Sequence, residues 1–158
     1  LFSTDRFDKN SNAVIDIVLR PAANGSTSDV DFNIGIANGT HTSDADSIGE
    51  YVFFHIDGGS TTIKAQSKDG FNNVAAVTTG VTLSAGSAVA NRLHLKIDCR
   101  NPASLKLYIN GVAVATGSTF RIDGATGPFG LLGHLEKVTG TATGQFIIDR
   151  FTVRTGEQ

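Results

Sequence analysis

The sequence contains few of the residues from which many functional sites are built. Its 158 residues include one Cys, two Tyr, three Pro, no Trp and no Met. A single Cys excludes an internal disulfide and a thiolate metal cluster. Strand alternation places Cys99 on the opposite face from His94, so we expect an inert thiol. A chain that begins at Leu1 and lacks Met is expected to be a fragment, a processed product or the ordered part of a longer protein.

Charge and long apolar runs are also scarce. Thirteen Lys and Arg against fifteen Asp and Glu give a formal net charge of −2, with a pI near 6.0. This composition shows no basic footprint for nucleic acid. The uninterrupted apolar runs are far shorter than a membrane span requires. We therefore expect neither nucleic acid nor a membrane as a partner.

The alternation of apolar and polar residues indicates an all-β chain. Between Arg92 and Phe120, two segments (92–98 and 105–109) have the period of two that is typical of a strand buried on one face. Asn110-Gly111 then predicts a tight hairpin into residues 112–115, because a type I′ turn needs positive φ at both central residues. No stretch of ten or more residues carries helical spacing.

Further short strands are predicted along the rest of the chain. We expect them at residues 7–20, 30–36, 51–56, 61–66, 74–79, 81–83, 129–135 and 145–154, with a break at Pro21–Gly25. Tyr51–Ile56 is apolar on both faces and predicts a central strand covered on each side. With no internal repeat or linker, residues 1–158 are expected to be a single domain, in which 1–11 are a candidate N-terminal arm.

The predicted architecture is an antiparallel two-sheet β-sandwich of the jelly-roll type, with essentially no helix. Its inner faces are expected to carry a set of alternating apolar residues. These are Ile15, Ile17, Phe32, Ile34, Leu93, Leu95, Leu105, Leu107 and Ile148.

Several segments resemble the concanavalin A-like lectin and glucanase jelly roll, including its laminin-G-like members. They read FNIGIANG, EYVFFHIDGG, RLHLKID, LKLYINGVAVA and FIIDRFTVRT in chain order. The hairpin Tyr108-Ile109-Asn110-Gly111 and the closing strand Ile148–Val153 are similar to recurring features of that group. The resemblance extends from about Ala13 to Thr155 and implies fold rather than function, since this sandwich hosts lectins, glycosidases, adhesion modules and virion proteins.

The stretch GIANGTHTSDADSIGEYVFFHIDGG resembles structural proteins of tailed bacteriophages. That resemblance implies a virion location and a role as a capsid decoration (cement) protein, with capsid or tail proteins as partners. A homotrimer would suit such a position, because cyclic symmetry can match a local axis of the shell. The alternative is a carbohydrate-binding or adhesion module whose partner is a glycan.

The chain is not expected to be an enzyme. Glucanases of this fold carry a Glu-x-Asp-x-x-Glu run on one strand, so that two carboxylates flank the scissile bond. This sequence has three Glu, at 50, 136 and 157, and none lies in such a run. The nearest group of carboxylates, Asp44, Asp46 and Glu50 beside His41, lies in a polar loop that offers little to raise a carboxyl pKa.

Four residues are candidates for ligand binding. Asn38, Asp44 and Asp46 in the loop 38–49 have the oxygen ligands that calcium prefers, so Asp44 and Asp46 are candidate calcium ligands. Asp and Asn are also frequent in loops simply because they close turns. Tyr108 alternates with core residues and is a candidate platform for a sugar ring. Packing on a neighbouring strand is the structural alternative.

Overall fold

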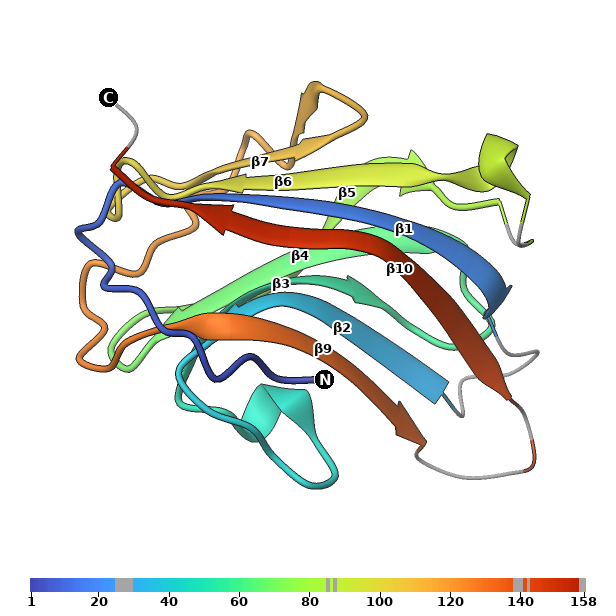
Figure 1. The fold of residues 1–158 in the computed structure, drawn as a ribbon, viewed down its shortest axis with the longest axis horizontal. Coiled ribbons are helices and arrows are strands. Elements are labelled where there is room, and N and C mark those ends of the chain that lie inside the picture. Colours follow the sequence, from blue (N-terminus) through green and yellow to red (C-terminus); the bar gives the residue numbers. More distant parts are fainter. Residues whose placement is uncertain (25–29, 85, 87, 138–140, 142, 157–158) are drawn as a thin grey trace.

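The computed structural model describes residues 1–24, 30–84, 86, 88–137, 141 and 143–156, and it contains two antiparallel sheets packed face to face (Figure 1). Sheet I has the order β10(Gly144–Arg154)-β1(Val14–Asn24)-β6(Leu93–Asp98)-β7(Lys106–Ile109)-β8(Val112–Val114). Sheet II has the order β5(Asn73–Thr82)-β4(Thr62–Asp69)-β3(Glu50–Ile56)-β2(Val30–Ala37)-β9(Gly130–Lys137). The only helical elements among the described residues are two 3₁₀ turns, η1(Ala45–Ser47) and η2(Val89–Asn91). The predicted all-β sandwich is confirmed.

The strongest local predictions hold. Asn110 and Gly111 have φ of 51° and 82°, as a type I′ hairpin requires, and they connect β7 to β8. All seven residues of β3 are buried, as the apolar run predicts. No helix in the described part of the chain has the length and apolar character needed to cross a membrane.

Three predicted strand boundaries are wrong. The first strand begins at Val14 rather than at residue 7, since Phe7 forms only an isolated bridge with Phe129. The break at Pro21 does not occur, because β1 continues to Asn24, while Gly25 lies outside the described residues. Pairing of β1 with β6 ends at Leu19, and the register with β10 shifts between Pro21 and Ala23, so the missing N–H of proline is tolerated there. The segments predicted at 74–79 and 81–83 form one strand, β5, which passes through Gly80 at φ 75°.

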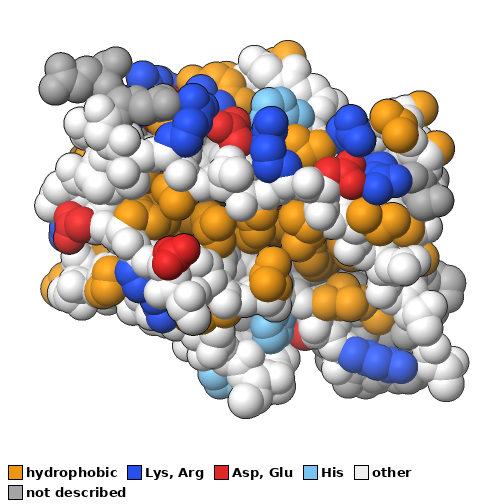
Figure 2. Space-filling model, viewed as in Figure 1, with side chains coloured by type: hydrophobic (Ala, Val, Ile, Leu, Met, Phe, Trp, Pro, Cys, Tyr) orange, Lys and Arg blue, Asp and Glu red, His pale blue; other side chains and the backbone are white. Residues whose placement is uncertain are grey.

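The predicted alternation of β10 is also wrong, because the strand contains a bulge. Val18 pairs with Arg150 whereas Leu19 pairs with Ile148, so Asp149 has no partner residue in β1. Ile148 therefore packs on the core together with Phe151 and Val153, which strict alternation would place on the other face. On this side of the molecule a band of apolar atoms is visible between the two layers (Figure 2).

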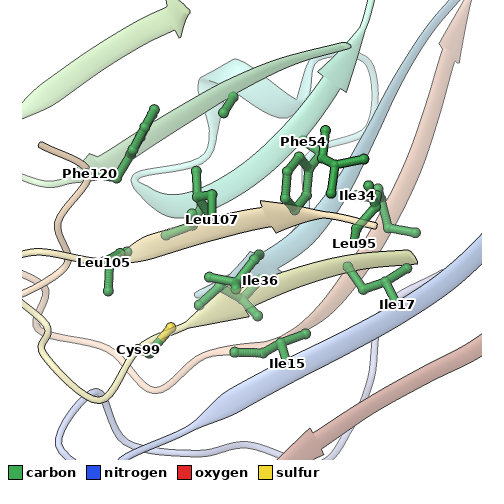
Figure 3. Packing of buried hydrophobic residues seen from close by; sticks show 14 of the residues in the cluster. Ile15, Ile17, Ile34, Ile36, Phe54, Leu95, Cys99, Leu105, Leu107 and Phe120 are labelled. Carbon is green, nitrogen blue, oxygen red and sulfur yellow. The ribbon is translucent and has the colours of Figure 1, made fainter. Parts of the chain in front are cut away.

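The core lies between the sheets and contains the predicted inner residues. Ile15, Ile17, Ile34, Leu95 and Leu107 are each no more than 2% exposed, and Figure 3 shows the two layers of side chains facing one another. Phe32, Leu93 and Leu105 belong to the same cluster, and Ile148 packs against it partly buried. Cys99 is a free, buried core residue whose pKa is raised by burial, which disfavours the reactive thiolate.

The N-terminal segment continues sheet II beyond β9. Phe2 pairs with Leu132, and Phe7 pairs with Phe129, each as an isolated antiparallel bridge. Ser3 N–H donates to the Leu131 carbonyl at 2.9 Å, and Gly133 N–H donates to the Leu1 carbonyl at 2.9 Å. The first residues of the chain therefore cover part of the edge that β9 would otherwise expose.

Gly35 is the position in β2 where the strands approach most closely. A Cβ added there would lie 2.1 Å from Val52 O and 3.2 Å from Phe53 Cα, both backbone atoms that cannot move aside. We expect Gly35→Ala to lower the free energy of unfolding by about 2–3 kcal/mol in a urea titration, because β2 and β3 must separate. Gly39→Ala is the matched control, since a Cβ there meets nothing within 4 Å. Equal stability of the two variants would contradict the close approach.

Candidate functional site

The outer face of sheet II is partly covered by the loop that precedes β3. Ala45 and Ile48 of this loop pack against Tyr51, Phe53 and Leu132 on the outer face and form a second, smaller apolar cluster. Tyr51 and Phe53 stack with ring centroids 4.5 Å apart. Burial, followed by the nearby Asp46 and Asp44 charges, raises the pKa of Tyr51 to about 12. The loop 38–49 therefore forms a wall on one part of this face, visible below sheet II in Figure 1.

Next to this wall, three buried polar side chains lie side by side on β2, β3 and β4. Asn33, His55 and Gln66 are 1%, 7% and 3% exposed. His55 Nδ1 lies 2.7 Å from Asn33 Oδ1, and Gln66 Nε2 donates to the same oxygen at 3.4 Å. Gln66 Nε2 also donates to Asp46 Oδ1 of the loop at 2.5 Å. These contacts satisfy groups that would be costly to bury without partners.

At the turn after β3, this group of polar side chains extends to the solvent-exposed surface. His55 Nε2 lies 2.7 Å from Asp57 Oδ1, and Lys64 of β4 forms a salt bridge with the other oxygen of Asp57. The side chains of Asp57 and Lys64 are 33% and 31% exposed. Burial opposes ionisation of Asp57, but the hydrogen bonds from Lys64 and His55 outweigh it and lower the pKa of this carboxyl. A ligand can therefore meet a carboxylate and an ammonium group at this rim.

On the other side of Asn33, β9 adds two titratable residues. His134 pairs with Asn33 and Glu136 pairs with Asp31 in the β2–β9 register, so all four share the outer face. Burial, together with the Asp44 and Asp31 charges, raises the pKa of Glu136, although the Ala45 N–H donates to its Oε2 at 2.9 Å.

His134 contains the one buried side-chain polar atom without a hydrogen-bond partner among the described residues, Nε2. It lies 3.4 Å from Glu136 Oε2 but not in hydrogen-bond geometry, and the side chains of His134 and Glu136 are 14% and 11% exposed. A buried polar atom left without a partner is unusual in a folded protein and is expected to bond to a ligand or an ordered water. We refer to Asp31, Asn33, Asp46, His55, Asp57, Lys64, Gln66, His134 and Glu136 as the outer-face cluster.

The residue types of the outer-face cluster suit a ligand rich in hydroxyl groups. Carboxylates accept hydrogen bonds, lysine donates, and histidine and amide side chains do both, depending on the atom. A sugar hydroxyl both donates and accepts, so alternating donors and acceptors can hold several hydroxyls in one orientation.

Of the four candidate residues in the sequence, only Asp46 joins this cluster. Asp44 instead caps η1, since its carboxylate accepts from Asp46 N–H and Ser47 Oγ, each at 2.8 Å. Hydrogen bonding to Ser47 is the main cause that lowers the pKa of Asp44. Within the described residues, no group of three or more His, Cys, Asp or Glu is arranged to hold a metal ion. Calcium binding by Asp44 and Asp46 stays a prediction.

Asn38 lies at the end of the sandwich and supports Glu50. Asn38 Nδ2 donates to Glu50 Oε2 at 2.9 Å. Thr126 N–H donates to Glu50 Oε1 at 2.7 Å and Gly127 N–H donates to Oε2 at 3.0 Å. Asp69, the partner of Glu50 in the β3–β4 register, accepts from Gly124 N–H at 3.2 Å. These two buried carboxylates therefore hold the loop 124–127 rather than a ligand.

Tyr108 lies on the opposite sheet from the other three candidates. Its side chain is on the outer face of sheet I, half-buried, with Lys96 Nζ 5.2 Å from the ring centroid. The sequence placed Asn38, Asp44, Asp46 and Tyr108 in one candidate set, whereas the fold distributes them over three places.

The sequence pattern did not single out His55, Gln66 or His134. Each is a polar residue inside a strand, and the period of two alone assigns such residues to an exposed face. The available signal was the polar residue within an apolar run, as His55 interrupts Phe53-Phe54 and Ile56. Only the tertiary structure shows that Asp46 of the loop 38–49 contacts Gln66 and that His134 Nε2 is buried.

Comparison with known proteins finds similarity in structure but none in sequence. No protein-family model matches the sequence, and no curated protein matches it. A carbohydrate-binding module, CBM66 from Bacillus subtilis, superposes with a TM-score of 0.53 at 14% identity, covering 98% of this chain and 80% of that chain. Chicken galectin 2 gives a TM-score of 0.55 at 10% identity, with 92% of each chain covered.

A third similar structure is an enzyme. The β-glucanase of Bacillus licheniformis gives a TM-score of 0.61 at 15% identity, covering 99% of this chain and 70% of that chain. At these identities the similarity shows the fold alone. The chain thus has the concanavalin A-like jelly-roll fold that the sequence segments resemble, which lectins, carbohydrate-binding modules and a glucanase share.

The contacts of Glu50 predict a pH-dependent contribution to stability. Burial would raise its pKa, but the hydrogen bonds from Thr126, Gly127 and Asn38 lower it below the ordinary value of 4.5. The stabilisation is therefore present above the unfolded-state pKa and is lost as the pH falls through the lower folded-state pKa. We expect Glu50→Gln to lower the free energy of unfolding by about 1–3 kcal/mol at neutral pH and by less near pH ~3.

The matched control for this substitution is Asp123→Asn, which removes a carboxylate paired with Arg121 in the same region at 34% exposure. Its effect on the free energy of unfolding is expected to stay below about 1 kcal/mol, because surface ion pairs contribute little. Urea titrations across the pH range measure both variants. A Glu50→Gln penalty that is the same at acidic and neutral pH would contradict the role of the ionised carboxylate.

Proposed function

We propose that this chain is a lectin-like carbohydrate-binding module that holds a glycan against the outer face of sheet II. The observation that carries the proposal is the outer-face cluster, in which nine polar residues converge and one buried ring nitrogen, His134 Nε2, has no hydrogen-bond partner among the described residues. The presence of galectins and a carbohydrate-binding module among the similar structures supports this function.

The arrangement of the site suits recognition of hydroxyl groups. Asp57 and Lys64 are held together at the exposed rim, where one accepts and the other donates. Behind them, His55 contacts both Asp57 and Asn33, so the rim is supported by buried hydrogen bonds that fix its orientation. Side chains held in this way lose little conformational entropy when a ligand binds.

We propose binding without hydrolysis. Asp31 and Glu136 are neighbours across β2 and β9, but the oxygen Oε2 of Glu136 already accepts the Ala45 N–H and lies close to His134. The strand sequences also lack the Glu-x-Asp-x-x-Glu run of the glucanases of this fold. The carboxylates therefore serve to orient the loop 38–49 and to accept hydrogen bonds.

The role in a phage particle rests on the sequence resemblance alone. A virion location, capsid or tail proteins as partners and a homotrimeric state stay predictions, to be tested by purifying particles and measuring the copy number of this chain. The glycan-binding proposal takes precedence because it rests on a specific group of side chains.

The first test is a glycan array followed by calorimetry with the best ligand. We expect Asp57→Ala combined with Lys64→Ala to weaken binding by roughly tenfold or more, since the double change removes the exposed donor and acceptor of the rim. Thr152→Ala, at an exposed position on the outer face of sheet I, is the control and should bind like the wild type. Sugar binding that is unaffected by the double change would overturn the site.

A second test separates binding from catalysis. Incubation with β-glucan should release no reducing ends from the wild-type protein or from Glu136→Gln, because Glu136 Oε2 is already held by the Ala45 N–H. Release by the wild type that disappears in Glu136→Gln would identify a glycosidase and contradict the proposal. Release that persists in the variant identifies a contaminating enzyme.

A further inference from the structure

The charges of this protein are unevenly distributed between its two faces. The outer face of sheet I and its rim carry seven Lys and Arg side chains against three Asp, an excess of four positive charges on a chain whose net charge is −2. The cations are Arg20, Arg92, Lys96, Arg100, Lys106, Arg150 and Arg154, and the acids are Asp16, Asp98 and Asp149. We refer to this surface as the basic face. Figure 2 shows Lys and Arg side chains gathered along this layer with acidic side chains between them.

The strand register brings these residues together. Asp16 pairs with Lys96, Lys96 pairs with Tyr108, and Asp98 pairs with Lys106, so one face carries them in adjacent rows. Diagonal neighbours such as Lys96 and Lys106 are about 7–8 Å apart at the backbone. The net charge of the whole chain does not reveal this concentration of charge, because four strands that are separated in the sequence contribute to it.

The three acids neutralise only part of the positive charge. Asp149 pairs with Arg20 at 2.6 Å and with Arg92 at 3.0 Å. Asp16 pairs with Arg154 at 2.8 Å, and Asp98 pairs with Arg100 at 2.5 Å.

Lys96, Lys106 and Arg150 form no salt bridge among the described residues. Arg150 lies 3.5 Å from His94 Nε2, and the contact of Lys96 is with the Tyr108 ring. These three cations are therefore available to an anion, on a face where cations outnumber acids.

A shallow hollow of about 450 Å³ lies beside the unpaired lysines. It is lined by Asp98, Arg100, Asn101, Ser104, Lys106 and Tyr108. The lining combines two cations, one carboxylate, neutral hydrogen-bonding groups and an aromatic ring, which are the groups that recognise a sugar bearing a negative charge.

We propose that the basic face binds an acidic polysaccharide, with the hollow at Tyr108 receiving one charged sugar unit. Lys106 and Lys96 pair with the carboxylate or sulfate of the ligand, and Asn101 and Ser104 of the hollow bond its hydroxyls. This site is on the sheet opposite the outer-face cluster, so the protein has two distinct faces for glycans of different charge. Neither site contributes a residue to the other.

The interspersed acids favour a polysaccharide over nucleic acid. DNA carries one negative charge per ~1.7 Å of helix axis, and Asp16, Asp98 and Asp149 would repel so dense a backbone. The hydroxyls of an acidic polysaccharide carry no charge, so they can lie against these ion-paired carboxylates without repulsion.

The test measures binding of polygalacturonate and dextran sulfate, with neutral dextran as reference, at low and at physiological ionic strength. We expect the wild type to bind both acidic polymers and to weaken with salt. The double substitution Lys96→Gln with Lys106→Gln should raise the dissociation constant roughly tenfold. Lys68→Gln with Lys137→Gln changes the net charge equally on the other sheet and should leave binding within about twofold.

Two further variants examine the hollow itself. Tyr108→Phe keeps the ring and is expected to bind like the wild type, whereas Tyr108→Ala should lose several-fold in affinity at unchanged thermal stability. The double variant Asp57→Ala with Lys64→Ala should bind the acidic polymers as the wild type does. A wrong assignment of the outer-face cluster can therefore be distinguished from a wrong assignment of the basic face.

Three outcomes would overturn the proposal. The first is that the wild type binds neither acidic polymer at low ionic strength. The second is that the two lysine double variants lose the same affinity for these polymers. The third is that Tyr108→Ala binds them as tightly as the wild type. Tighter binding of single-stranded DNA or of phosphatidylserine vesicles than of the polysaccharides, abolished by the Lys96 and Lys106 changes, would assign the face to nucleic acid or to a membrane instead.

Discussion

Burial of β3 on both of its faces is the constraint on which the rest of this structure depends. The inner face of β3 packs into the core between the sheets, and its outer face lies under the loop 38–49 and beside β2 and β4. Because His55 lies on that covered outer face, it and its neighbours Asn33 and Gln66 must bond to one another. The outer-face cluster is thus a consequence of covering a sheet face that still contains polar residues.

The two sheets present solvent with different chemistry. Sheet II offers a small, rigid set of donors and acceptors under a loop, while sheet I offers a broad face on which cations outnumber acids. A two-sheet sandwich permits this division because the outward residues of each sheet do not affect the core. The same fold can therefore carry unrelated sites on its two surfaces, and for this reason the likeness to lectins and to a glucanase shows architecture only.

Particular residues show how far the sequence reaches toward the site. Asp46 was a candidate and does belong to the outer-face cluster, through Gln66. Tyr108 was a candidate for its aromatic ring, and the fold places it in the hollow of sheet I, apart from the other candidates. Asn38 and Asp44 make intramolecular hydrogen bonds, to Glu50 and to the first turn of η1, and their roles in ligand binding stay predictions. Spacing along the chain cannot distinguish these roles, since each depends on which distant strand lies opposite.

The sequence by itself determined the fold class, the type I′ hairpin at Asn110-Gly111 and nearly all of the core, because period-two alternation and turn chemistry are local properties of the chain. Only the tertiary structure decided the bulge at Asp149, the continuation of β1 through Pro21, the hydrogen-bond partners of His55 and the gathering of seven cations on one face. Each of these follows from the register between strands far apart in sequence. Register is set by the packing of the whole sandwich, not by any one segment.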